Sequence, residues 1–373
     1  MRILKIVNGN DKGGVFTCEK QFIEELRQRG AVVDVIILGE GNSADEYQKI
    51  SSSSFKLPAL EASYGGPIFS ILSSILVTYR YGVKYSRVIE NQISASTKYN
   101  AIIYRRPLFM HFAGQLAKRL KTKVLWHLPN VARTTFSKNY YNAFCKRYGI
   151  VQVANSFFTK SSLGRQCKYV VYPGFDNKRV EKSAPVFRDN LDLGSDTPVY
   201  GLAARMHEDK AQDLVVEAFV NSDVSRNGGH LLIAGEPLDS DFALKVQEKA
   251  GSLFNKQVHF LGNITSMPEF YSSVDVVING RRNVEPFGIT IAEAMGAGKP
   301  VIAYKLGGPS EMIVDGANGW LVDKATALSY QQAFNLSISK KNTWPEMGRI
   351  AKENSYKFTV EKNVDTLLEI INT

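Results

Sequence analysis

Short apolar runs alternate with amphipathic stretches along this chain. Residues 2 to 7 (RILKIV) predict a buried strand, and a loop containing Gly13 and Gly14 leads into a helical spacing that ends at Gly30. The next apolar run, residues 31 to 38 (AVVDVIIL), predicts a second strand. This order of strand, loop, helix and strand is a βαβ unit, so we expect a parallel sheet whose ligands lie at the carboxyl ends of its strands.

The alternation continues after a polar loop at residues 51 to 54 and is interrupted once. Further strands are expected at residues 101–104, 123–127, 150–154, 168–173, 199–204, 230–235, 258–262, 274–279 and 300–304. Helices are expected around residues 108–120 and 135–147. Another is expected to begin at about residue 210, a further one to end at about residue 253, and a last one to follow residue 285. Between Pro173 and Pro198 the pattern lapses, which indicates a linker between two α/β domains. Residues 343 to 371 are helical in pattern and are expected to return to brace the first domain.

Residues 285 to 303 (EPFGITIAEAMGAGKPVIA) predict a helix whose N-terminus binds a ligand. The free N–H groups and the dipole of such a helix favour an anion, and Gly288 allows close approach. Glu285 precedes the helix and Glu293 lies within it, roughly 10 Å apart at about 1.5 Å per residue. The two carboxylates can therefore reach opposite ends of one ligand.

Two cations follow an earlier strand at the same predicted edge. Arg205 comes directly after the strand that ends near Ala204, and Lys210 lies five residues further on. A guanidinium can clamp phosphate oxygens and an ammonium adds a point charge, so a diphosphate fits this position. Arg and Lys in a loop are more often solvated surface, and only their place after a strand favours the binding role.

The charge of the chain is unevenly distributed. The net charge is +10 over 373 residues, yet residues 1 to 170 hold 25 Lys and Arg against 10 Asp and Glu, and the remainder holds 21 against 26. No Asp or Glu occurs between Glu90 and Asp176, where fourteen Lys and Arg lie. An anionic partner is expected for this half. We expect no nucleic acid, because no motif of a nucleic-acid module is present.

Residues 68 to 90 (IFSILSSILVTYRYGVKYSRVIE) allow two readings. One is a core helix followed by a solvated turn. The other is an interfacial helix whose apolar groups meet lipid while its cations meet anionic headgroups. No apolar run reaches the ~20 residues of a membrane span, and the first one is too short for a signal peptide. We expect a cytoplasmic protein that can lie on the inner face of the cytoplasmic membrane.

The second half resembles the retaining GT-B glycosyltransferases of family 4. Their Glu, seven residues, Glu motif stands here as Glu285 to Glu293, with Arg205 and Lys210 upstream. The other matching segments, in the family's order, are VHFLGNI at 258–264, VDVVIN at 274–279, GAGKPVIA at 296–303 and GGPSEMI at 307–313. The resemblance covers residues 199 to 322, whereas the first half matches mainly in its Gly-Gly loop and architecture.

The resemblance implies a GT-B fold, with two Rossmann-like domains facing each other across a cleft. The expected domains are residues 1–175, completed by a helix at about 356–373, and residues 176–355. The implied activity moves a hexose-type sugar, with retention, from a UDP- or GDP-sugar to a glycan or lipid-linked acceptor in surface polysaccharide or lipopolysaccharide biosynthesis. The acceptor would lie over the basic first domain.

The family's roles can be carried over to the motif. Glu293 would bind the ribose hydroxyls and Glu285 a hydroxyl of the donor sugar, next to the reaction. The Phe287 and Gly288 amides, with Ile289 beside them, would lie near the sugar and phosphates.

Other donor contacts would come from neighbouring loops. Arg205 and Lys210 would bind the diphosphate, so no metal or other cofactor is required. Gly262, Asn263 and Ile264 would lie beside the base.

In the first domain, Gly13 and Gly14 would approach the sugar and phosphates. His127 matches the family's active-site histidine, although a single His at a strand end is as often a packed core residue. His111 competes for this role, and His207 could contact phosphate.

The basic stretch between Glu90 and Asp176 supplies no carboxylate as nucleophile or base. We therefore expect front-face transfer, in which the leaving diphosphate deprotonates the acceptor. The alternatives are a GT-B nucleotide-sugar epimerase and a non-catalytic nucleotide-sugar or glycan binding subunit. Residues 239 to 241 (DSD) resemble the metal motif of GT-A enzymes, but their place before a helical pattern favours an N-cap.

Overall fold

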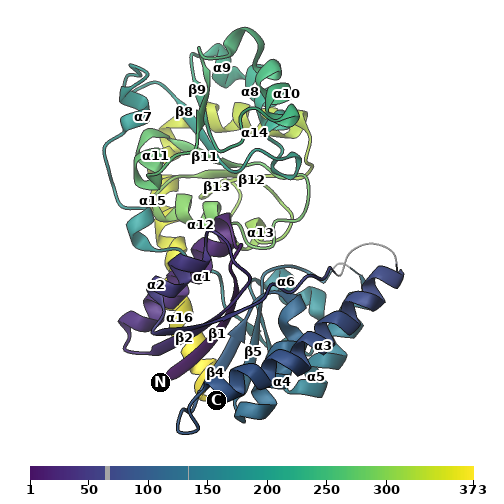
Figure 1. The fold of residues 1–373 in the computed structure, drawn as a ribbon. Helices are drawn as coiled ribbons and strands as arrows, with labels where there is room; N and C mark the ends of the chain where they lie inside the picture. Colours follow the sequence, from purple (N-terminus) through teal and green to yellow (C-terminus); the bar gives the residue numbers. More distant parts are fainter. Residues whose placement is uncertain (64–67, 133) are drawn as a thin grey trace. The chain divides into compact units, whose positions relative to one another are not determined.

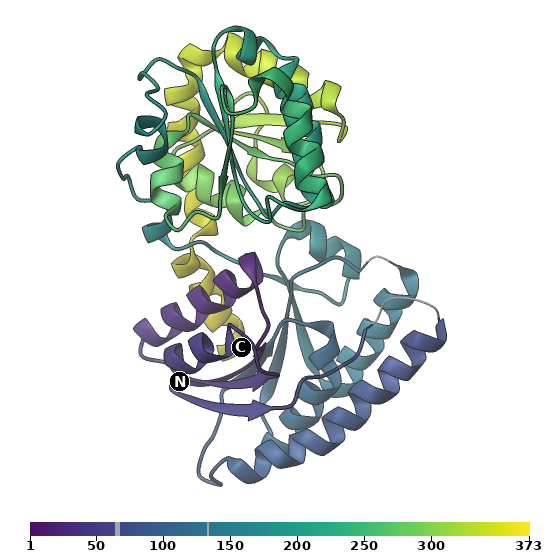
Figure 2. The same ribbon diagram turned by 45° about the horizontal axis from the view of Figure 1, so that its top comes forward.

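The computed structural model describes residues 1–63, 68–132 and 134–373, which form two compact α/β units (Figures 1 and 2). The first unit comprises Met1–Gly174 and Val360–Thr373, and the second comprises Phe175–Thr359. Each unit has its own parallel sheet. The sequence placed the first boundary after residue 175 and the second near residue 356.

The sheet of the first unit has seven strands in the order β3-β2-β1-β4-β5-β6-β7. The strands are β1 (Arg2–Asn8), β2 (Val32–Leu38), β3 (Ser53–Leu57), β4 (Ala101–Tyr104), β5 (Lys123–Leu128), β6 (Ile150–Ala154) and β7 (Tyr169–Val170). The helices are α1 (Gly13–Gln28), α2 (Ala44–Ile50), α3 (Ile68–Gln92), η1 (Pro107–Phe109), α4 (Met110–Leu120), α5 (Thr135–Tyr148), α6 (Phe157–Leu163) and α16 (Val360–Asn372).

Helices cover both faces of this sheet, with α3, α4 and α5 on one side and α1, α2 and α16 on the other (Figure 1). Alternate residues of a strand therefore enter different cores. Leu4 of β1 packs with the α4 side, while Ile3 packs with α1 and α16. The predicted return of the C-terminal segment is confirmed for α16, whose Val364 and Leu367 are buried in the second of these cores. The earlier part of the segment, α15 (Trp344–Ser355), belongs to the second unit instead.

The sheet of the second unit has six strands in the order β10-β9-β8-β11-β12-β13. The strands are β8 (Val199–Ala203), β9 (His230–Ala234), β10 (Val258–Gly262), β11 (Val276–Asn279), β12 (Val301–Tyr304) and β13 (Gly319–Val322). The α-helices are α7 (Val186–Asp189), α8 (Gln212–Val220), α9 (Asp223–Arg226), α10 (Asp241–Ala250), α11 (Met267–Ser273), α12 (Ile289–Gly296), α13 (Pro309–Met312), α14 (Ala327–Ser339) and α15 (Trp344–Ser355). The short 3-10 turns are η2 (Asn177–Arg179), η3 (Glu208–Lys210), η4 (Gly251–Leu253), η5 (Lys341–Thr343) and η6 (Tyr356–Phe358).

Two local predictions were wrong. The polar loop at residues 51 to 54 contains the start of the edge strand β3, which pairs with β2 through main-chain hydrogen bonds and needs few apolar side chains. The solvated turn expected after the apolar half of residues 68 to 90 is absent among the described residues, because α3 continues to Gln92. Its second half stays helical because Tyr81 and Ile89 are buried against the core. Gly82 lets α3 approach α4 closely, since a Cβ there would lie 2.9 Å from the His111 carbonyl carbon.

Candidate functional site

The candidate site lies at the carboxyl edge of the second sheet, where the strand order reverses. The chain runs from β8 to β9 and β10 on one side, and then from β11 to β12 and β13 on the other. Loops that leave β8 and β11 therefore diverge at this point, which is where open parallel sheets bind ligands. The β8 loop carries Arg205 and Lys210, and the β11 loop carries Arg281 and Glu285.

Glu285 is held between two cations. Its Oε2 lies 3.1 Å from Arg281 Nε and 3.6 Å from Lys210 Nζ. Its backbone is also fixed, because its N–H donates to the Leu306 carbonyl and its own carbonyl accepts from the Gly308 N–H. The carboxylate is thus placed by main-chain and side-chain contacts at once.

The environment of Lys210 perturbs its titration. Burial is the largest influence and lowers the pKa of its ammonium group, and the positive charges of Arg281 and Arg205 act in the same direction. The Glu285 carboxylate opposes this shift without reversing it. Arg205 is exposed in the loop that follows β8, and its charge is the smallest of the influences that lower the pKa of Lys210.

The helix that follows Glu285 begins at a glycine in a left-handed conformation. Gly288 has φ +98° and is the N-cap of α12, so it contributes no side chain to the first turn. An alanine here would be strained, and its Cβ would also lie 2.8 Å from Ile291 Cδ1. Phe287 is buried at 3% exposure and packs edge-on against Phe358. The first-turn amides are therefore presented without a side-chain cap, as an anion-binding terminus requires.

Two buried polar atoms near this edge have no hydrogen-bond partner among the described residues. They are Gln212 Oε1 at the start of α8 and Asn279 Oδ1 at the end of β11. A buried polar atom left unpaired costs about 1–3 kcal/mol. A bound polar ligand or ordered water would satisfy them, which supports a binding site at this edge.

Glu293 is the fifth residue of α12 and is only 1% exposed. Its Oε1 accepts a hydrogen bond from Arg179 Nε at 2.6 Å, and its Oε2 accepts one from the Tyr271 hydroxyl at 2.9 Å. Arg179, Tyr271 and Arg281 are the residues of this site that the sequence analysis missed. Of these three residues, only Arg281 has a signal in the sequence, because it follows a predicted strand.

The remaining predicted donor residues lie at the carboxyl end of the edge strand β10. Gly262 ends the edge strand β10 with φ +66°, and its carbonyl accepts from the Gly235 N–H. Asn263 is exposed and Ile264 is half-buried in the loop that follows. His207 is exposed, and its Nδ1 accepts from the Asp209 N–H at 3.2 Å, so it caps η3.

In the first unit, His127 is buried at 2% exposure near the end of β5. Its Nε2–H donates to the Val171 carbonyl at 2.7 Å, and its ring packs on Phe22. Burial lowers the pKa of this imidazole well below its usual range, and the charges of Arg105 and Lys5 add to the effect. His127 is therefore neutral with one nitrogen occupied, and its catalytic role stays a prediction.

His111 and the glycine loop differ in accessibility. His111 is fully buried between the hydroxyls of Tyr148 and Tyr140, and burial lowers its pKa to about 4. Gly13 starts α1 with φ +55°, and both it and Gly14 are exposed.

The carboxyl edge of the first sheet does carry carboxylates, supplied by residues before Glu90. Asp11 follows β1 and is 3% exposed, and it forms an ion pair with Arg106. Its Oδ2 accepts from the Tyr47 hydroxyl at 3.1 Å. Glu19 of α1 is buried in an ion pair with Lys5 and lies 3.4 Å from Arg105 Nε. These carboxylates are engaged by the protein's own cations.

The segment at residues 239 to 241 caps a helix. Ser240 is the N-cap of α10, and its hydroxyl accepts from the Ala243 N–H at 3.2 Å, while Asp241 lies in the first turn. The N-cap interpretation is confirmed.

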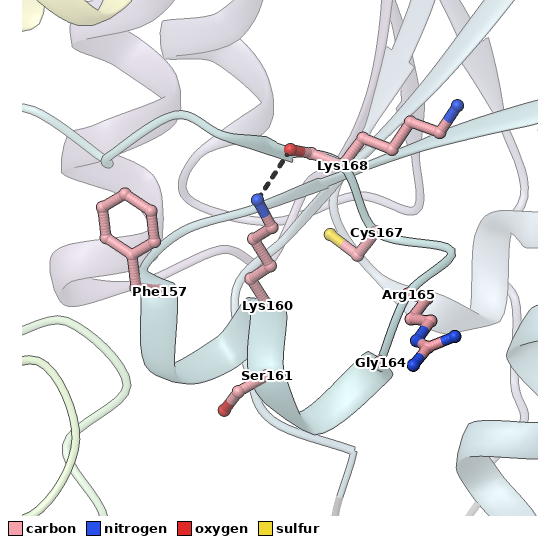
Figure 3. Close-up of a pocket in the computed structure, with 7 residues that line it drawn as sticks. All are labelled: Phe157, Lys160, Ser161, Gly164, Arg165, Cys167 and Lys168. Carbon is pink, nitrogen blue, oxygen red and sulfur yellow. Dashed lines mark hydrogen bonds between the residues drawn. The ribbon is translucent and has the colours of Figure 1, made fainter.

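The first unit contains a basic pocket of about 560 Å³ beside α6 and β7 (Figure 3). Its lining residues are Phe157, Lys160, Ser161, Gly164, Arg165, Cys167 and Lys168. Lys160 Nζ donates to the Lys168 carbonyl at 2.9 Å. Burial raises the pKa of the Cys167 thiol, so the lining carries positive charge and no negative charge.

Comparison with known proteins gives the family context. Residues 184–358 match the family model of the glycosyl transferases group 1. The lipopolysaccharide 1,2-N-acetylglucosaminetransferase of Salmonella typhimurium is 31% identical over 162 residues, which are 41% of this chain and 42% of that protein. The α-1,3/1,6-mannosyltransferase ALG2 of Dictyostelium discoideum is 26% identical over 350 residues, covering 81% of this chain and 79% of that protein.

A solved structure gives the fold context. The Anabaena protein Alr3699/HepE, crystallised with UDP, matches all of this chain and all of its own with a TM-score of 0.81 at 19% identity. At this identity the likeness establishes a shared architecture, the GT-B fold.

Proposed function

Because residues 184–358 match the family model of the glycosyl transferases group 1, we propose that this chain transfers a hexose-type sugar from a nucleotide-diphosphate sugar to a glycan or lipid-linked acceptor. The observation that carries the proposal is the arrangement at the switch point of the second sheet. There, Glu285 is held between Lys210 and Arg281, beside an uncapped helix N-terminus.

The donor is proposed to be a UDP- or GDP-sugar with its diphosphate at this helix. Arg205, Lys210 and the α12 amides would neutralise the phosphates, with Phe287, Gly288 and Ile289 at the start of the helix. Glu293 would bind the ribose. The base would lie along Gly262 to Ile264, and UDP bound to the Anabaena protein of the same fold supports a nucleotide of this kind. In this proposal, Arg205 and Lys210 neutralise the diphosphate, so that no metal ion is required.

We infer front-face transfer with retention of the anomeric configuration. The bond between the anomeric carbon and the diphosphate oxygen breaks while the acceptor oxygen bonds to the same face of the carbon. The acceptor proton passes to a leaving phosphate oxygen, so that no enzyme carboxylate is consumed as nucleophile. Glu285 would hold a sugar hydroxyl, and the roles proposed for His127 and the Gly13-Gly14 loop are those that the family resemblance implies.

The test of this function is a thermal-shift panel with UDP, GDP and ADP, followed by turnover with the matching sugars. A ligand that binds the native state raises the melting temperature by mass action, and about 100 Kd of ligand adds about 2.7 kcal/mol. We expect one diphosphate to shift Tm clearly and its uncharged nucleoside to shift it little. Absence of a shift from all three would contradict the proposal. Conversion of donor alone to an epimer would favour an epimerase instead.

The acceptor is proposed to be anionic or lipid-linked, as in lipopolysaccharide or another surface polysaccharide. The Salmonella relative is named for lipopolysaccharide, which supports this class. The pocket lined by Lys160, Arg165 and Lys168 offers a place for an anionic group, with the exposed Phe157 ring beside it. Carbohydrate rings pack well on aromatic faces, so this lining suits a phosphorylated or carboxylated sugar.

We also propose that α3 rests on the inner face of the cytoplasmic membrane. In the parts of the chain that the structure describes, none of the helices combines the length and apolar character of a bilayer span. However, the N-terminal half of α3 exposes large apolar side chains, including Phe69 at 81%, Leu72 at 52% and Leu76 at 48%. Arg80, Lys84 and Arg87 are exposed in the next turns. Such a surface suits an anionic lipid interface.

Two triple variants test the membrane and acceptor surfaces against each other. Neutralising Arg80, Lys84 and Arg87 to Gln should weaken binding to anionic liposomes by about 100-fold, since each of the three cations near the surface contributes about 1 kcal/mol. Neutralising Lys160, Arg165 and Lys168 removes the same charge from the same unit. It should preserve liposome binding while raising KM for a soluble anionic acceptor. Equal liposome binding by wild type and the α3 variant would remove the membrane proposal.

A further inference from the structure

The Glu293 carboxylate is bound by two side chains that belong to no recognised motif. Arg179 lies 114 positions before it, and Tyr271 lies 22 positions before it. Both carboxylate oxygens are engaged, at 2.6 Å and 2.9 Å, and the side chain is almost completely buried. A buried carboxylate needs paired and hydrogen-bonded partners, and these two residues supply them.

Arg179 is placed by the segment that begins the second unit. Asp176 caps η2 by accepting from the Lys178 N–H at 2.9 Å, which fixes the turn that ends at Arg179. Phe175 packs against Gly296 of α12, where a Cβ would lie 2.7 Å from the Phe175 ring. The turn is thus anchored on the same helix that carries Glu293, and it presents the guanidinium to that carboxylate.

The charge states of both partners suit a holding role. Burial works against the charge of Arg179, but the charge and hydrogen bond of Glu293 outweigh it, so the pKa of the guanidinium is raised. Burial, and then the Glu293 charge, raises the pKa of the Tyr271 hydroxyl well above its usual value. Arg179 therefore remains a cation and Tyr271 a neutral donor. Neither accepts a proton from a ligand.

We propose that Arg179 and Tyr271 are positioning residues that hold the Glu293 carboxylate in the orientation that reads the nucleotide ribose. This inference rests on the proposed function, in which Glu293 meets the ribose hydroxyls. An ionised carboxylate has about four acceptor positions, and the two donors occupy one on each oxygen. In this proposal, the remaining acceptor positions take two neighbouring ribose hydroxyls when the nucleotide binds. Fixing the carboxylate beforehand lowers the entropic cost of binding them.

The test measures binding of UDP and 2′-deoxy-UDP to the full chain by calorimetry, with GDP or ADP and its deoxy form if the panel selects that base. Arg179→Gln should weaken UDP by about tenfold, the size expected for a lost charged hydrogen bond. The same substitution should weaken binding of 2′-deoxy-UDP less, so that the ratio of the affinities for UDP and 2′-deoxy-UDP decreases. Arg179→Lys and Tyr271→Phe should give smaller changes in the same direction.

Arg188→Gln is the matched control. Arg188 forms an ion pair with Asp275 at 2.9 Å in the same unit, but Asp275 lies at the amino edge of the sheet, where its N–H bonds to Val199. This variant should lower the thermal stability of the protein, as Arg179→Gln also should, and leave the preference for UDP over 2′-deoxy-UDP unchanged.

A double-mutant cycle separates the positioning role from the role of Glu293 itself. In a Glu293→Gln background, Arg179→Gln should have little further effect on UDP affinity, because the group that it positions is already altered. Equal weakening of UDP by Arg179→Gln in both backgrounds would overturn the inference. So would an unchanged affinity and ribose preference in a folded Arg179→Gln protein. If Glu293→Gln itself leaves UDP affinity unchanged while Arg179→Gln weakens it, the proposed ribose role fails and the positioning role fails with it.

Discussion

Glu285→Gln is expected to reduce kcat/KM by about 10²- to 10³-fold, the range seen when an enzyme loses a hydrogen bond that strengthens in the transition state. The substitution keeps the shape of the side chain but removes the charge that Arg281 and Lys210 flank at 3.1 and 3.6 Å. A neutral amide would hold the sugar hydroxyl less strongly and would free both cations to reorient. Steady-state kinetics with the donor chosen by the thermal-shift panel measures the loss.

Glu248→Gln is the control for this variant, because Glu248 is an exposed carboxylate on α10 of the same unit. It should retain near-full activity. Near-full activity in Glu285→Gln would remove both the role of Glu285 and the front-face mechanism. NMR assignment of the product anomer gives a second check on the mechanism, and an inverted product would contradict it.

Lys210→Gln is expected to weaken the binding of UDP by about tenfold or more and to lower kcat as well. The ammonium is proposed to neutralise the diphosphate both in the bound donor and as it leaves, so its loss affects binding and transfer together. Uridine lacks the diphosphate, and its affinity should change little. Calorimetry with UDP and uridine on the same variant therefore identifies which part of the nucleotide Lys210 contacts.

Lys245→Gln provides the matched loss of one positive charge, since Lys245 is exposed on α10. Its affinity for UDP should equal that of the wild type within error. Lys210 would not be a diphosphate ligand if its substitution weakened uridine as much as UDP. It would equally be excluded if Lys245→Gln reproduced the loss, because the effect would then come from the overall charge.

Strands with continuous apolar runs were predictable because both of their faces are buried. The runs at residues 2 to 7 and 199 to 204 became β1 and β8 for this reason. The edge strand β3 was missed because an edge can be held by main-chain hydrogen bonds, with Ser53 and Ser54 as residues. The full length of α3 was missed because its second half is stabilised by tertiary contacts of Tyr81 and Ile89, which a mixed tyrosine and basic pattern conceals.

The candidate site was predictable to the extent that its residues follow strands. Arg205, Lys210 and Glu285 could be placed at one sheet edge, because parallel strands bring their carboxyl ends together. Their pairing could not be predicted, since Lys210 and Glu285 are 75 positions apart and the contact depends on which strands are neighbours. Asp11 and Glu19 were overlooked for the same reason. Their partners, Arg106 and Arg105, come from a segment that is distant in the sequence.

The sequence by itself determined the α/β alternation, the two carboxylates eight positions apart, the glycine before the helix and the cations after β8. These features are local, and spacing along a helix or strand is enough to define them. Only the tertiary structure decided that Glu285 lies between Arg281 and Lys210, and that Glu293 is held by Arg179 and Tyr271. Charges buried in a folded chain need partners, and packing brings those partners from distant parts of the sequence.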